Sequence, residues 1–198
     1  SPLPGSYFKD KSISKQEMIE TYSSIADLQK DDVDFFIIET MSSIDEAVSA
    51  VEALSNFNKE IILCFCLSEG DGTKLFSGEN LKEACDAIQI DKINGLCLNC
   101  SQIEDISKGL DILKKYNLPY GALPNNFQSV KPLKLGMSVD NIKKRNDILI
   151  EDFVNYAVTW LNNGCTILGG CCEITPDYIN GLNNYFMNNR YKKTNLFN

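Results

Sequence analysis

Short apolar runs alternate with longer amphipathic segments along this chain, and the alternation limits the folds that it can adopt. The apolar runs are rich in Ile, Leu, Phe and Cys, as expected of strands that are buried on both faces. They span residues 34–39, 61–67, 94–99, 119–123 and 166–169. The amphipathic segments predict helices over residues 15–29, 43–54, 79–88, 103–115, 150–161 and 176–185. A strand followed by a helix, repeated in this way, predicts an α/β fold with parallel strands, either a barrel or a doubly wound sheet.

Three of the predicted helices begin with capping signals. Ser43 with Glu46, and Ser101 with Glu104, have the spacing of a capping box, in which a hydroxyl and a carboxylate satisfy free backbone N–H groups. Pro176 suits the first turn of a helix, where no backbone N–H is needed. These signals place the predicted helix starts directly after strands.

Composition favours one globular domain that binds small molecules. The chain has 198 residues, 43% of them hydrophobic, so we expect a single domain over residues 1–198 with a polar, frayed tail at 189–198. A net charge of −8, with lysines interspersed among acids, argues against nucleic acid or an anionic membrane as partner. No stretch reaches the roughly 20 apolar residues of a membrane helix, and the first residues lack a secretory pattern. We therefore expect a cytoplasmic location.

Eight cysteines and the absence of histidine narrow the possible chemistry. Thiols stay reduced inside cells, so eight cysteines there are not a disulfide framework, and metal binding, catalysis or burial must explain them. Without histidine, this chain cannot supply a Ser/His/Asp or Cys/His catalytic set or a mixed His/Cys zinc site. Its chemistry has to rest on Cys, Asp, Glu, Lys, Tyr or a cofactor.

Three cysteines follow predicted strands. Cys171 and Cys172 come after Gly169 and Gly170, which free the backbone so that two adjacent thiols can turn toward one point. Cys100 follows the strand at 94–99. The carboxyl ends of parallel strands share one rim, so the three thiols can converge. Zinc favours tetrahedral sulfur ligands, and three protein ligands leave a fourth position for substrate.

Other interpretations of the cysteines stay open at this point. Cys171 and Cys172 could be buried small residues or a strained vicinal disulfide. Cys97 and Cys100 form a CxxC that could be a redox pair, although Cys97 lies inside the apolar strand. The remaining four are predicted to be buried small hydrophobic residues of the core or barrel lining. These are Cys64, Cys66, Cys85 and Cys165.

Glu39 ends the first apolar strand and is followed by Thr40. A carboxylate at the carboxyl end of a strand points into the same rim as the thiols and could bind a substrate ammonium group. The alternative is an ordinary solvated acid in a loop.

The motifs together resemble one known family. The segments GGCCEITPDYI at 169–179, GLCLNCS at 95–101 and FFIIETMSSIDEA at 35–47 are similar to those of the homocysteine S-methyltransferase family. The likeness extends from the SPLPGSY opening through the PNN at 124–126, and the motifs occur in the family's order.

The resemblance implies a (β/α)8 TIM-type barrel and a zinc-dependent methyl transfer. Cys100, Cys171 and Cys172 would bind Zn²⁺, Glu39 with its neighbour Thr40 would bind homocysteine, and Asn99 would lie beside the metal. A sulfonium donor such as S-methylmethionine or S-adenosylmethionine would methylate the homocysteine thiol and give methionine. No motif identifies the donor.

The family's first two strands, one of them with an Asp-Gly signature, are not found in this sequence. We therefore expect an incomplete barrel covering about strands 3 to 8, which a further segment or a second chain would complete. Two other functions remain possible on sequence grounds: a noncatalytic or partner-dependent zinc-binding remnant, and a Cys-based oxidoreductase.

Overall fold

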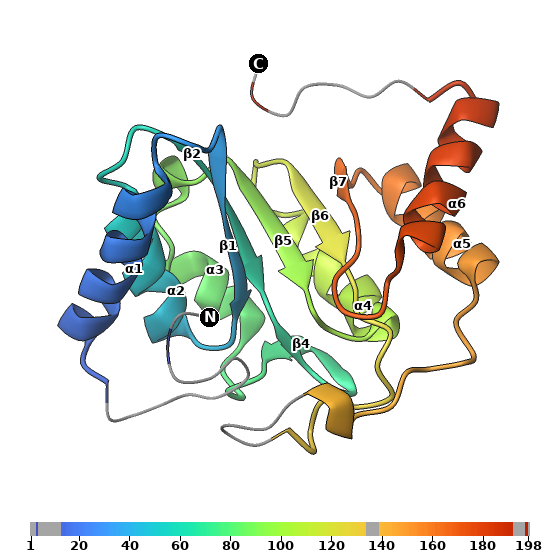
Figure 1. Cartoon of the computed structure of the whole chain (residues 1–198), viewed down its shortest axis with the longest axis horizontal. Helices are drawn as coiled ribbons and strands as arrows, with labels where there is room; N and C mark the ends of the chain where they lie inside the picture. Colours follow the sequence, from blue (N-terminus) through green and yellow to red (C-terminus); the bar gives the residue numbers. More distant parts are fainter. Residues whose placement is uncertain (1–2, 4–12, 134–138, 192–196, 198) are drawn as a thin grey trace.

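Five parallel strands form the central sheet of the computed structural model, which describes residues 3, 13–133, 139–191 and 197 (Figure 1). They follow one another across the sheet in chain order: β1 (Phe35–Met41), β2 (Glu60–Phe65), β5 (Gly95–Asn99), β6 (Tyr120–Leu123) and β7 (Ile167–Leu168). Each crossover therefore moves one place in the same direction, as it does in a (β/α) barrel. The predicted α/β fold of incomplete-barrel type is confirmed.

The described residues also form six α-helices, one in each predicted segment. They are α1 (Lys15–Gln29), α2 (Ile44–Leu54), α3 (Leu81–Ala87), α4 (Ile103–Leu113), α5 (Ile150–Asn162) and α6 (Pro176–Asn188). In Figure 1, α1 and α2 lie at the left of the sheet and α5 and α6 at its right. None of these helices, as far as the chain is described, has the length and apolar character needed to cross a membrane.

The main core lies between the helices and one face of the sheet. In β1, Phe36 and Ile38 are buried in this core, whereas Ile37 and Glu39 between and after them are exposed on the opposite face. That opposite face carries a smaller apolar cluster centred on Ile62, Cys64 and Cys97. The two clusters correspond to the outer layer and the inner lining of a barrel wall.

A short antiparallel hairpin interrupts the predicted strand at 61–67. Its strands are β3 (Leu67–Ser68) and β4 (Asp71–Leu75), and Gly70 between them has a φ of +83°. Gly72 packs so closely on α4 that a Cβ there would lie 2.2 Å from the carbonyl oxygen of Asp105. The glycines at 70 and 72 are the sequence signal for this turn. The apolar run before them was predicted as one continuous strand over residues 61–67, so the hairpin was not predicted.

The helix starts differ in part from the capping predictions. Ser43 does accept a hydrogen bond from the Glu46 N–H, but the Glu46 carboxylate binds Tyr22 Oη and the Ser42 N–H instead of closing the box. The capping box predicted at Ser101 is wrong. Gln102 is the N-cap of α4, because the buried Ser101 hydroxyl is used in a bond to the hairpin.

A complete capping box occurs where none was predicted, at the start of α1. The Ser14 hydroxyl accepts from the Glu17 N–H, and the Glu17 carboxylate accepts from the Ser14 N–H. Ser14 and Glu17 have the same Ser-x-x-Glu spacing as the two predicted boxes, so the signal was present in the sequence and was overlooked.

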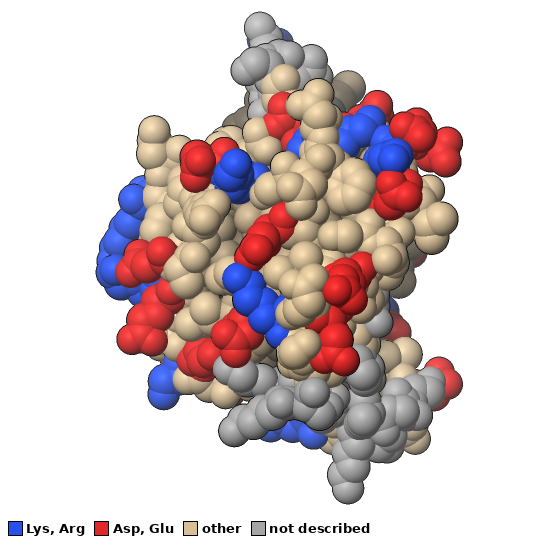
Figure 2. All heavy atoms as spheres, turned by 90° about the vertical axis from the view of Figure 1, so that its left-hand side faces the viewer, with Lys and Arg blue, Asp and Glu red and all other residues tan. Residues whose placement is uncertain are grey.

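Both edges of the sheet are open within the described residues, at β1 and at β7. A groove of about 220 Å³ runs between α1 and β1, and its walls include Tyr22, Ile25 and Ile37. The face of the molecule at the left of Figure 1 carries acids and bases interspersed, with no block of one sign (Figure 2).

Five strands are one fewer than the six implied by strands 3 to 8. The further strand expected near the opening falls on residues of which only Leu3, Ile13 and Ser14 are described before α1. The predicted frayed tail at 189–198 also falls largely outside the described residues. Its described part includes Tyr191, whose ring packs against Phe186 on α6.

Candidate metal centre

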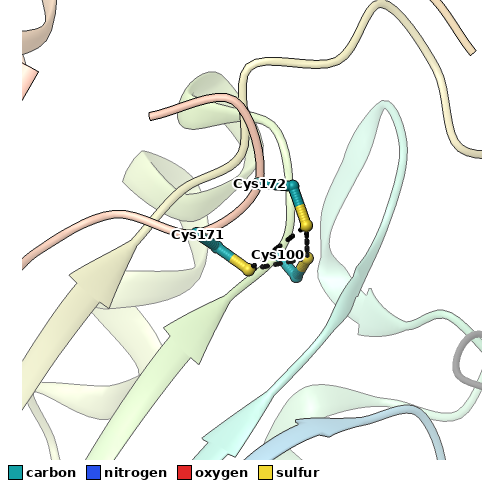
Figure 3. Close-up of side chains that lie close together, drawn as sticks. All are labelled: Cys100, Cys171 and Cys172. Atoms are coloured by element: carbon teal, nitrogen blue, oxygen red, sulfur yellow. Dashed lines mark hydrogen bonds between the residues drawn. The ribbon is translucent and has the colours of Figure 1, made fainter. Parts of the chain in front are cut away.

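Three cysteine side chains meet at the carboxyl-end rim of the sheet (Figure 3). Cys100 follows β5, and Cys171 and Cys172 lie in the loop between β7 and α6. The sulfur of Cys100 is 2.9 Å from that of Cys171 and 3.5 Å from that of Cys172. The sulfurs of Cys171 and Cys172 are 3.8 Å apart. The structure thus brings together the three thiols that the sequence singled out.

The backbone around the thiols is irregular, and this is what turns adjacent side chains toward one point. Cys100 has a φ of +49° and Glu173 a φ of +64°, a conformation that non-glycine residues adopt rarely. Neither Gly169 nor Gly170 has a positive φ, so the turn toward the thiols does not use the left-handed region that glycine favours. Gly170 is needed for space, because a Cβ there would lie 2.2 Å from Ile174.

The donor set fits a zinc ion. Tetrahedral zinc with bonds of about 2.3 Å places its sulfur ligands roughly 3.8 Å from one another, so the triangle needs only a small expansion to hold the metal. Cys100 is buried, whereas Cys171 and Cys172 are half-buried, so the cluster has one accessible side. A ligand or substrate could reach a metal bound there from that side.

Hydrogen bonds among the thiols shift the pKa values of Cys171 and Cys172 in opposite directions. The Cys172 sulfur lies within hydrogen-bond distance of Cys100 and Cys171, and these contacts lower its pKa. The Cys171 thiol donates to the Cys100 sulfur, which raises its pKa, and burial adds to the rise. The cluster therefore stabilises a thiolate, the form in which cysteine binds metals.

Asn99 and Thr40 link the ends of two strands that are not neighbours in the sheet. The Thr40 N–H donates to Asn99 Oδ1 at 2.9 Å, and Asn99 Nδ2 donates to Thr40 Oγ1 at 3.0 Å. Both residues are buried. Their predicted contact with substrate stays a prediction, and the contact that they make in the structure is with each other.

Glu39 is exposed on the inner face of β1, immediately before Thr40. Since Thr40 is bound to Asn99 and Asn99 precedes Cys100, the carboxylate lies on the same rim as the thiols. The register between β1 and β2 shifts between Ile38 and Met41, and this bulge sets the direction of Glu39.

The other five cysteines are buried free thiols outside the triad. Cys64 and Cys97 are paired in register on β2 and β5 within the inner cluster, and burial with their mutual hydrogen bond raises the pKa of Cys64. Burial raises the pKa of Cys85 and of Cys165 to about 12. Cys97 and Cys100 therefore belong to different clusters, which does not favour a CxxC redox pair.

In the sequence, the loop at 124–126 was noted only as part of the family resemblance, and no role was assigned to it. The loop at 124–126 contacts both halves of the thiol cluster, through Asn125 on one side and Pro124 and Asn126 on the other. An Asn-Asn pair after a strand is an ordinary turn signal, so nothing in the pattern set it apart.

The fold and site define the class of incomplete (β/α) barrels with a three-thiol cluster on the carboxyl-end rim, an arrangement that could hold a thiophilic metal. The family model described as homocysteine S-methyltransferase matches residues 2–186, and the chain belongs to this family.

Curated relatives agree with this assignment, and a solved structure has a similar fold. The chain is 30% identical over 168 residues to a selenocysteine Se-methyltransferase of Brassica oleracea var. italica, covering 82% of this chain and 46% of that protein. It is 28% identical over 171 residues to homocysteine S-methyltransferase 2 of Arabidopsis thaliana, covering 82% and 48%. The metallated form of the homocysteine methyltransferase MmuM from Escherichia coli has a similar fold, with a TM-score of 0.67, 20% identity and coverage of 91% and 56%. The chain thus spans about half the length of these relatives.

Proposed function

We propose that this chain takes part in methylating the thiol of homocysteine, giving methionine, with Zn²⁺ held by Cys100, Cys171 and Cys172. The convergence of three sulfurs that lie 2.9 to 3.8 Å from one another carries the proposal. The family supports the homocysteine substrate, and the metallated form of the MmuM homologue supports a metal at such a site.

The reaction joins a sulfur nucleophile to a methyl carbon. When bound, zinc lowers the pKa of the substrate thiol and holds it as a thiolate near neutral pH. The thiolate sulfur forms the new S–CH₃ bond, the bond from the methyl carbon to the sulfonium sulfur breaks, and the donor leaves as a neutral thioether. The proton of the substrate thiol passes to solvent, so the chain needs no histidine base.

The residues of this chain bind and orient the amino acid. Glu39 accepts hydrogen bonds from the ammonium group of homocysteine, and Thr40 and Asn99 hold the strand end that carries Glu39. A segment or second chain beside the open β1 edge would close the site from the other side. The methyl donor is S-methylmethionine or S-adenosylmethionine, and activity assays with each donor separate the two.

Metal analysis tests the proposal directly. The full-length, reduced protein is expected to hold one zinc per chain, and Cys171→Ser or Cys172→Ser is expected to abolish tight binding because a thiolate ligand is lost. Cys85→Ser is the matched control, a buried thiol on α3 outside the cluster, and should keep its zinc. Protein with intact thiols and no zinc would refute the metal site.

A further inference from the structure

The loop at 124–126 lies between the two halves of the thiol cluster and is bonded to both. The Cys171 N–H donates to the Pro124 carbonyl at 2.8 Å, and the Asn126 N–H donates to the Cys172 carbonyl at 2.9 Å. On the other side, the Asn125 N–H donates to the Ser101 carbonyl at 3.0 Å. The distance between Cys100 and the Cys171–Cys172 pair therefore depends on this loop.

The Asn125 side chain forms a hydrogen bond from this loop to one of the thiol segments. Its Nδ2 donates to the carbonyl oxygen of Cys100 at 2.7 Å, while its Oδ1 accepts from the Phe127 N–H at 3.2 Å. The side chain is only 5% exposed, so neither bond competes with solvent. The two bonds fix the orientation of the amide.

The residue that accepts this hydrogen bond from Asn125, Cys100, has a disfavoured backbone conformation. Cys100 has a φ of +49°, and this backbone geometry sets the direction in which its Cβ and sulfur leave the chain. A donor fixed on its carbonyl oxygen stabilises that geometry. The Cys66 thiol makes a longer contact with the same oxygen at 3.6 Å, which is weaker than an amide donor.

We propose that Asn125 is a positioning residue for the metal site, which holds Cys100 in the conformation that aims its sulfur at the other two thiols. This inference rests on the proposed zinc site and concerns a residue outside the three thiols, whose amide bonds in the structure are to the backbone of Cys100 and Phe127. Outer partners of metal ligands typically change metal affinity 10- to 100-fold, and we expect an effect of this size.

Asn126 offers a matched comparison in the same loop. It is also buried, but its Nδ2 donates to Tyr178 Oη at 3.1 Å, and its Oδ1 has no hydrogen-bond partner among the described residues. Its contact with Cys172 uses the backbone N–H, which a side-chain substitution leaves in place. Asn125→Asp and Asn126→Asp add the same charge one residue apart, but only the first removes a donor to a thiol segment.

The test measures zinc affinity of the full-length protein by competition with a chromophoric chelator, under reducing conditions. We expect Asn125→Asp to weaken zinc binding 10- to 100-fold and Asn126→Asp to change it less than about threefold. The sulfur-to-metal charge-transfer band of the Co²⁺-loaded protein should also change only in the Asn125 variant. Thermal unfolding of the metal-free proteins in chelator reports any loss of structure separately. Asn125→Ser and Asn126→Ser repeat the comparison without added charge if an Asp variant does not fold.

Equal zinc affinities in the Asn125 variants and the unsubstituted protein would overturn the positioning role and leave the zinc site standing. Equal losses in the Asn125 and Asn126 variants would overturn it as well, since the effect would then be general damage to the loop. An unsubstituted protein that binds no zinc would overturn the zinc site and this inference together.

Discussion

Thr40 and Asn99 show how one amide can stabilise a disfavoured backbone. Thr40 has a φ of +62°, and its branched side chain makes that region costly, on the order of 1–3 kcal/mol. The Asn99 side chain satisfies both the N–H and the hydroxyl of Thr40 inside the protein. This pair holds the bulge in β1 from which Glu39 projects.

Removal of the Asn99 amide should therefore destabilise the fold. We expect Asn99→Ala to lower the free energy of unfolding of the full-length protein by about 1–3 kcal/mol, because the buried Thr40 N–H loses its acceptor. Urea denaturation measures the change. The control is Asn155→Ala on the exposed side of α5, which should shift it by less than about 0.5 kcal/mol. Equal effects of the two substitutions would contradict the assigned role of Asn99.

Glu39 is predicted to bind the substrate rather than to maintain structure, because its side chain is exposed. In the full-length enzyme we expect Glu39→Ala to weaken homocysteine binding by about 1.5–3 kcal/mol, or roughly 10- to 150-fold, with zinc content unchanged. Calorimetric titration measures the affinity. Glu20→Ala on α1 is the control for loss of one surface acid. Unchanged affinity in the Glu39 variant would exclude Glu39 from the site.

The sequence predicted the meeting of the three thiols but not the contacts that hold them. The ends of parallel strands share one rim, so residue type and strand position were enough for Cys100 and Cys171. The role of Asn125 depends on which carbonyl its amide reaches across 25 positions of chain, and no local pattern carries that information. Ser101 was misassigned for the same reason, because its partner Leu67 belongs to a distant hairpin.

At the scale of elements, α4 is tied to the segment before α5 by a two-pronged ion pair. Arg145 Nη1 and Nη2 donate to the two Glu104 carboxylate oxygens at 2.8 and 2.7 Å. The hydrogen bonds from Arg145 hold the pKa of Glu104 below its ordinary value of 4.5. The Arg145 N–H also donates to the Asn126 carbonyl, so this link adjoins the loop beside the thiols.

The lowered pKa of Glu104 predicts a pH-dependent contribution to stability. A carboxyl group whose pKa is lower in the folded state stabilises the protein above its unfolded pKa, and the effect is lost as pH falls through the folded pKa. Because Glu104 is partly exposed, we expect Glu104→Gln to cost only about 1 kcal/mol at pH 7. Urea denaturation at several pH values should show the difference from the unsubstituted protein shrinking as pH falls below the unfolded pKa of about 4.3 and disappearing below the lowered folded pKa. A difference that persisted undiminished to low pH would mean that packing, not charge, is responsible.

Periodicity predicted the helices and the parallel strands because each buries one continuous apolar face. It failed at β3 and β4, where the apolar run at 61–67 crosses from the sheet into the hairpin without a change in composition. The end of β2 is decided instead by tertiary contacts, among them the hydrogen bond from the Cys66 N–H to the Met41 carbonyl. Such contacts join residues that are far apart in the sequence, so the periodicity of a short segment cannot reveal them.

At the scale of the whole molecule, the open edge at β1 leads us to expect opposite effects of one substitution. Ile37→Asp should act differently in the full-length protein and in a protein limited to residues 1–198. Ile37 is 45% exposed on the inner face of β1 and lines the groove beside α1. In a closed barrel this face would be interior. We therefore expect Ile37→Asp to lower the stability of the full-length protein by about 3 kcal/mol, because an apolar contact is lost and a charge is buried.

In a protein limited to residues 1–198, the same substitution should instead reduce self-association through the exposed edge and apolar face. Sedimentation velocity of both lengths measures this, and Val139→Asp at another exposed apolar position is the control. A monomeric 198-residue protein that Ile37→Asp destabilises strongly would show that the chain closes its core by itself.

The separation of the thiols along the chain has a consequence for biosynthesis. Cys172 follows Cys100 by 72 positions, and the 124–126 loop between them has to be docked before the three sulfurs can meet. During synthesis from the N-terminus, Cys100 therefore leaves the ribosome well before its partners exist. A nascent chain has no high-affinity site with which to capture metal prematurely. On the proposed zinc site, metal uptake would be a late event, because it requires the segment from β7 to α6 to have reached its place.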